Sequence, residues 1–182
     1  MLAGNNIAEV SHLGVTDSKG YTIQKGEKSY RFWETSGLNE ETDSVPAQEA
    51  AKKLINLLKG MNVSLIIYLT RGRMNEVGAN KHMFDQIRSV CGEQVPIVLV
   101  VTGLEGEGEA MDEWWTSNKS DIERLKLSFQ GHACVTTIKG RNNMYEKEYQ
   151  DSRSKLWKLV QEHCSSLVSV LLDQNSRVHF CV

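Results

Sequence analysis

The second half of the chain alternates short apolar runs with segments of helical periodicity. The apolar runs are typical of buried strands and lie at residues 63–69, 95–101 and 132–138. Apolar side chains at a helical spacing predict helices at residues 50–60, 79–91 and 144–172, and a further one capped by Ser117. This β-α-β-α-β-α order predicts an α/β fold, in which a mostly parallel sheet carries helices on both faces.

The amino-terminal part of the chain has a different pattern. Residues 10–23 are weakly strand-like, residues 29–33 are rich in aromatic side chains, and a glycine-containing turn at 24–27 separates them. This combination predicts a β-hairpin. Residues 34–44 are polar and predict a loop, and Pro46 follows where the first-turn proline of a helix belongs.

Composition restricts the function only a little. The 182 residues suit one domain, and 21 Lys and Arg against 23 Asp and Glu argue against a broadly basic nucleic-acid surface. The four cysteines contain no C-x-x-C pair, which predicts no zinc site and a reducing, cytoplasmic location. No apolar run approaches the roughly 18 residues of a transmembrane helix.

Three predicted strands end in residues with chemistry suited to a nucleotide. Loops at the carboxyl ends of parallel strands are where α/β proteins bind ligands. In residues 34–37, a carboxylate could hold a Mg²⁺-bound water and a glycine could approach a phosphate. The carboxylate in 102–105 could accept two hydrogen bonds from guanine, and backbone amides in 136–139 could reach a base carbonyl. Each motif taken alone is more typical of an ordinary loop or strand.

Taken together, the order and placement of these motifs resemble a P-loop GTPase domain. Residues 34–37 resemble the D-x-x-G motif, 102–105 the N/T-K-x-D motif and 136–139 the S-A-K motif. The segment 66–73, with Glu76 and the helix to Cys91, resembles septin/GIMAP-like GTPases. Fungal proteins with a G domain are the most similar, particularly around Trp114-Trp115 and residues 131–134. The resemblance extends over about residues 1–170.

The resemblance implies a Ras-like three-layer fold, with a G domain over residues 1–173 and a tail over 174–182. It implies a GTP-binding, slowly hydrolysing switch that uses GTP or GDP with Mg²⁺ and pairs as a homodimer across the nucleotide face. The implied nucleotide contacts are Gly37, Thr102, Glu105, Thr136, Thr137 and Lys139. The implied Mg²⁺ ligands are Glu34 and Thr16, with Ser18 as an equal alternative to Thr16. No catalytic residue is assigned, because no glutamine follows Gly37.

Two other strings compete with this assignment. Residues 118–121 spell N-K-x-D literally, but they follow no buried strand and leave only 15 residues before Thr136, so we predict a helix start there. Residues 20–29 approximate G-x-x-x-x-G-K-[ST], but Glu27 is inserted before Lys28 and the segment separates two polar strands. A phosphate loop must lie between a buried strand and a helix, so we predict a hairpin.

The chain contains no phosphate loop, and its other motifs are degenerate. The resemblance implies that the first strand and this loop would precede Met1, and that their loss removes most nucleotide affinity. It also implies an interruption of the sheet between residues 29–33 and 63–69. Gly103 stands where the family has a base-packing lysine, and Glu105 replaces aspartate.

Three hypotheses follow for the function. The first is a G domain with impaired or absent nucleotide binding. The second is a pseudo-GTPase that serves as a protein-interaction module, and the third is an unrelated flavodoxin-like enzyme. A catalytic cysteine at Cys91 or Cys134 has no supporting histidine signature in the sequence.

Overall fold

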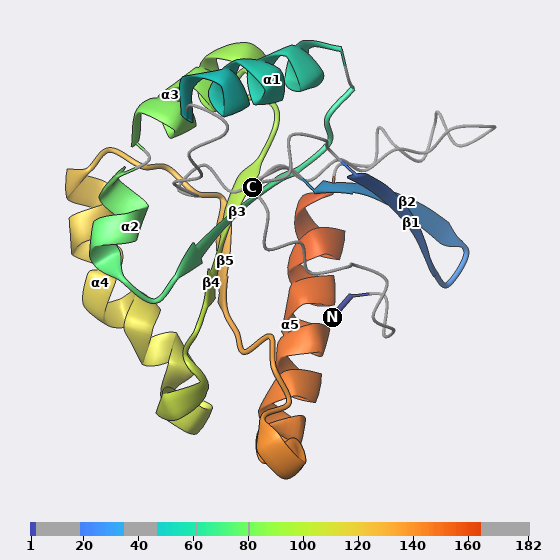
Figure 1. Cartoon of the computed structure of the whole chain (residues 1–182), viewed down its shortest axis with the longest axis vertical. Helices are drawn as coiled ribbons and strands as arrows, with labels where there is room; N and C mark the ends of the chain where they lie inside the picture. The colour runs from blue at the N-terminus through green and yellow to red at the C-terminus, as the bar shows by residue number, and fades with distance from the viewer. Residues whose placement is uncertain (3–18, 35–46, 61, 80, 165–182) are drawn as a thin grey trace.

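A computed structural model of the protein describes residues 1–2, 19–34, 47–60, 62–79 and 81–164 (Figure 1). In these residues an antiparallel hairpin is followed by alternating helices and parallel strands. The mixed α/β class predicted from the periodicity is therefore confirmed for the described part of the chain.

The hairpin consists of β1 (Lys19–Lys25) and β2 (Lys28–Glu34). Lys25 pairs with Lys28, so the connection is a two-residue turn. Gly26 occupies the turn with φ of 61°, a left-handed conformation that glycine adopts at little cost. The predicted hairpin is confirmed, and residues 20–29 are not a phosphate loop.

The parallel sheet has the strand order β3-β4-β5. Its strands are β3 (Ile66–Arg71), β4 (Ile97–Thr102) and β5 (Gly131–Cys134). All three predicted strands are present, but β5 is shorter than the predicted 132–138. The backbone N–H of Val135 still donates to Val101, whereas that of Thr136 turns away to the Ser152 hydroxyl. The ladder therefore ends before Thr136.

Helical segments fill most of the connections between strands. The α-helices are α1 (Ala47–Lys59), α2 (Met74–Ala79), α3 (Lys81–Cys91), α4 (Glu113–Arg124) and α5 (Glu146–His163). The 3₁₀ helices are η1 (Glu105–Asp112) and η2 (Arg141–Asn143). The prediction of a plain loop after β4 is corrected by η1, and the predicted helix 79–91 is preceded by the short α2.

Two predicted helix boundaries are wrong. Ser117 is not a cap: η1 runs directly into α4, and Asp112 at their junction has helical backbone angles. Residues 118–121 consequently lie inside α4, which agrees with our interpretation that they belong to a helix and not to a strand-end loop. At the other end, α5 stops at His163 because Cys164 is extended, with ψ of 103°. Residues 165–172 of the predicted helix lie outside the described residues.

Helices cover both faces of the parallel sheet (Figure 1). On one face, α1, α3 and α4 pack against Ile66, Tyr68, Leu99 and their neighbours. On the other face, α5 packs against Ile67, Val98, Val100, Ala133 and Val135. Successive strand residues enter opposite clusters because side chains alternate across a strand. Both faces are therefore apolar, as expected for a buried parallel sheet.

The hairpin does not pair with the parallel sheet. Strands β2 and β3 belong to different sheets, in agreement with the predicted interruption between residues 29–33 and 63–69. The hairpin packs instead on Trp157 of α5 (Figure 1). The rings of Tyr30 and Phe32 meet the indole edge-on, at centroid distances of 5.3 and 6.1 Å. Trp157 also donates a hydrogen bond to the Leu2 carbonyl at 3.2 Å.

We predict that Trp157→Ala destabilises the protein by about 3–5 kcal/mol, because it opens a cavity in the cluster that joins hairpin and sheet. Urea unfolding followed by circular dichroism measures the effect. Lys158→Ala is the matched control, since this side chain is 76% exposed and its loss should cost less than about 0.5 kcal/mol. A Trp157→Ala variant as stable as Lys158→Ala would contradict the assigned packing.

Candidate functional site

The candidate site lies at the carboxyl ends of β4 and β5, toward the lower end of the view in Figure 1. Val101 and Cys134 are register partners, so residues 102–105 and 136–139 leave the sheet from neighbouring positions. Thr102 and Glu105 therefore lie at the end of β4 and just after it, and Thr136, Thr137 and Lys139 follow the neighbouring strand β5 at the same edge of the sheet.

The loop after β4 is held firmly against the end of β3. The Thr102 hydroxyl donates to the Thr70 carbonyl at 3.2 Å, and the Gly72 N–H donates to the Thr102 carbonyl at 2.8 Å. Leu104 is buried, whereas Glu105 begins η1 and is partly exposed. The carboxylate of Glu105 is therefore attached to a rigid backbone at the sheet edge.

Gly103 has a backbone conformation that explains its identity. Its φ is +76°, in the left-handed region where residues with a side chain are strained. Any other residue at this position would have to adopt that strained conformation. Glycine therefore suits the backbone of this loop.

Gly72 lets the ends of β3 and β4 approach closely. A Cβ added at Gly72 would lie 2.5 Å from Leu104 Cδ2 and 3.5 Å from Trp114 Nε1. The first distance is too short for two carbon atoms, so a side chain at this position would displace the end of the Leu104 side chain. The end of β3 and the loop after β4 are thus joined by packing and by the Thr102 hydrogen bonds, and we refer to them together as the wall of the candidate site.

The loop after β5 uses most of its polar groups internally. Thr136 is fully buried, and its N–H donates to Ser152 Oγ at 3.0 Å. Its hydroxyl donates to the Ile138 carbonyl at 3.2 Å. Thr137, in contrast, is exposed. Thr136 therefore shapes this loop, and Thr137 is the member that a ligand can reach.

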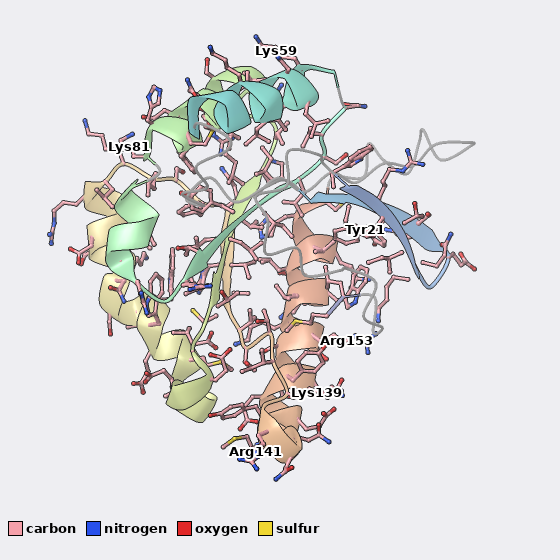
Figure 2. The ribbon with its side chains drawn as sticks, viewed as in Figure 1. Tyr21, Lys59, Lys81, Lys139, Arg141 and Arg153 are labelled. Atoms are coloured by element: carbon pink, nitrogen blue, oxygen red, sulfur yellow. The ribbon has the colours of Figure 1, made fainter. Side chains whose placement is uncertain are left out.

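Lys139 lies at the lower end of the molecule, near the start of α5 (Figure 2). Its ammonium is 3.0 Å from the Glu146 carboxylate and 5.4 Å from the ring centroid of Tyr149. Hydrogen bonds from Gln150 and from Lys139 lower the pKa of Glu146. Lys139 is thus engaged with α5, as an exposed ion pair that contributes little to stability.

The remaining predicted site residues are not assembled in the described part of the chain. Gly37, Thr16 and Ser18 lie outside the described residues. Glu34 is the last residue of β2, in the hairpin, and its side chain is not among those described. The predicted Mg²⁺ ligands therefore stay a prediction from the resemblance.

The fold assembles a cluster around β5 from residues of four elements, and no sequence motif predicted it. His132 stacks on Trp115 of α4, with a centroid distance of 4.0 Å and an interplanar angle of 12°. Beside them, Lys155 Nζ lies 2.8 Å from Asp112 and donates to the Cys134 carbonyl at 3.4 Å. These residues are spread over 112–155, so no local motif could have predicted their contact.

This cluster does not form a cysteine nucleophile. Cys134 is fully buried, and burial raises the pKa of its thiol to about 11. Only a thiolate is reactive, and almost none would form at neutral pH. Burial also raises the pKa of Cys91. The structure therefore offers no support for a catalytic cysteine at either position.

His132 should make the stability of the protein depend on pH. Burial lowers the pKa of His132, with Lys155 and Lys119 acting in the same direction and Asp112 opposing them. The unfolded chain therefore binds a proton more readily than the folded protein, and stability falls as pH drops through about 6.5. We predict that His132→Phe, which keeps a ring against Trp115, loses less thermal stability than wild type between pH 7.5 and 5.5.

Thermal melts followed by circular dichroism at several pH values measure this difference. His82→Gln is the control, because His82 is an exposed histidine on α3 and lies outside the cluster. Equal losses of melting temperature in wild type and His132→Phe would show that His132 does not contribute.

Among the described residues, no group of three or more His, Cys, Asp and Glu side chains is placed to hold a metal ion. None of the helices in those residues has the length and apolar character needed to cross a membrane. In comparisons with known proteins, no family model and no curated protein matches the sequence of this chain.

Proposed function

We propose that this protein is a guanine-nucleotide-binding domain of the septin/GIMAP-like type, whose loops after β4 and β5 recognise the base. The observation that carries this proposal is the adjacency of those two loops at one edge of a parallel sheet. They are the loops that resemble the N/T-K-x-D and S-A-K motifs, while the literal N-K-x-D string lies within α4. In this proposal, one purine base contacts both loops.

Each residue of the two loops has a defined role in this proposal. The Glu105 carboxylate accepts hydrogen bonds from the ring N–H and the exocyclic amino group of guanine, which adenine does not present in the same pattern. Thr137 lies on the exposed side of the second loop and faces the base carbonyl, and Thr136 holds that loop in shape. Thr102 fixes the backbone that carries Glu105.

The phosphate end of the nucleotide is expected to contribute little affinity. Glu34, Gly37 and Thr16 would contact Mg²⁺ and the γ-phosphate by resemblance, and a bound Mg²⁺ would neutralise phosphate charge. The sequence contains no phosphate loop with its lysine, which supplies much of the affinity in this class. The separation of β2 from β3 is what a Ras-like sheet without its first strand would have. We therefore expect weak binding that depends mainly on the base.

A second candidate is a pseudo-GTPase that binds a protein partner and no nucleotide. The observation that favours it is the internal use of polar groups in the loop after β5. Thr136 is bonded to Ser152 and Ile138, and Lys139 is paired with Glu146. In this case the loops would only support the scaffold, and the protein would have no preference for guanine.

Nucleotide titration separates the two candidates. We predict that the 182-residue chain binds fluorescently labelled GDP more tightly than labelled ADP in the presence of Mg²⁺. Glu105→Gln should weaken GDP binding by roughly 10- to 100-fold, because an amide cannot accept both hydrogen bonds and the charge is lost. Fluorescence anisotropy measures both affinities.

Glu107→Gln is the matched control, since Glu107 is an exposed residue of the same 3₁₀ helix and should leave GDP affinity unchanged. Absence of any preference for GDP over ADP at high micromolar protein would refute base recognition. That outcome would favour the pseudo-GTPase candidate.

A further inference from the structure

Arg71 is the side chain nearest to the space left open at Gly103. Arg71 ends β3 and is the register partner of Thr102, the residue before Gly103. A Cβ built on Gly103 would lie 4.0 Å from the Cβ of Arg71, and among the described residues, its chain neighbours aside, no other atom comes within that distance. Arg71 is exposed. It therefore stands beside the position that lacks a side chain in the candidate base-recognition loop.

The backbone around Arg71 is fixed relative to that loop. The two hydrogen bonds that join Thr102 to Thr70 and Gly72 lie on either side of Arg71 in the sequence. Gly72 packs against Leu104, because a Cβ added at Gly72 would lie 2.5 Å from Leu104 Cδ2. A residue held in this way needs only a side-chain rotation to reach a ligand, and such support is typical of residues that orient ligands.

The guanidinium of Arg71 has no partner among the residues that the structure describes. It takes part in no hydrogen bond, ion pair or ring contact with them. Two other basic side chains near this edge are paired, Lys139 with Glu146 and Lys155 with Asp112. An exposed arginine at a sheet edge, beside a glycine with φ of +76°, thus has both the freedom and the space to contact a planar ligand.

We infer that Arg71 stacks on the guanine ring and replaces the base-packing lysine that Gly103 cannot supply. This inference rests on the proposed function. The guanidinium group is planar and delocalised, and it stacks on aromatic faces better than an ammonium does. Arg71 therefore acts as a base-positioning residue from β3, while Glu105 provides the choice of guanine over adenine. Arg71 thus contributes to base binding from the end of β3, and Glu105 contributes from the start of η1.

Stacking and phosphate binding make different predictions for Arg71→Ala. A stacked arginine should contribute equally to GDP and to guanosine, so both affinities should fall by roughly 5- to 30-fold. An arginine that bound phosphate would weaken GDP alone. Because a stacking contact does not read the base edge, the ratio of GDP to ADP affinity should stay within a factor of about three.

The test is competition of guanosine, GDP and ADP against labelled GDP, with wild type, Arg71→Ala, Arg71→Lys and the control Arg124→Ala. Arg124 ends α4, a helix of 12 residues and so about 18 Å long, at the end away from η1. Arg71→Lys keeps the positive charge but lacks the planar guanidinium group. It should recover less than half of the binding energy that Arg71→Ala loses. A thermal melt of each variant checks that the fold is retained.

Each possible result of this experiment either supports or overturns the stacking role of Arg71. Equal losses for guanosine and GDP in Arg71→Ala, with an unchanged melting temperature and an unchanged guanine preference, support stacking. Unchanged affinities, a loss confined to GDP, or full recovery by Arg71→Lys would overturn it while leaving base recognition by Glu105 intact. Absence of guanine binding by wild type would overturn the proposed function and this inference together.

Discussion

The burial of β4 on both faces is the constraint on which the rest of the structure depends. Ile97, Val98, Leu99, Val100 and Val101 are all at most 2% exposed. Burying a side chain of this size contributes about 1.5–3 kcal/mol, so exposing either face of this strand would be strongly destabilising. Its alternate residues belong to two separate clusters, and helices must therefore cover both faces.

The same constraint determines where a site can form. A strand that is apolar from Ile97 to Val101 leaves polar chemistry to its last residue, Thr102, and to the residues after it. Parallel neighbours end at the same edge, so the loops after β3 and β5 join the loop after β4 there. The wall made by Arg71, Gly103 and Glu105 follows from this geometry, together with the close approach that Gly72 permits.

Sequence patterns were sufficient where the determining interaction is local. The hairpin was predictable because a turn glycine separates two strands that pair with each other, and the order of strands and helices was predictable because each has its own periodicity. The end of β5 was not, because the Ser152 hydroxyl that removes the Thr136 amide from the ladder comes 16 residues later. The start of α4 was missed because η1 continues into it without a cap.

The residues of the candidate site also differ in whether the sequence alone could identify them. The acidic and threonine residues after β4 and β5 could be singled out because each follows an apolar run. Arg71 could not, since its relation to Gly103 exists only once β3 and β4 pair in register. By the resemblance alone, glycine at position 103 in place of a lysine would weaken the proposed base recognition. In the folded protein the end of β3 carries the exposed cation Arg71 beside that glycine, so under the proposed function the loss of a lysine from this loop does not by itself imply loss of base recognition.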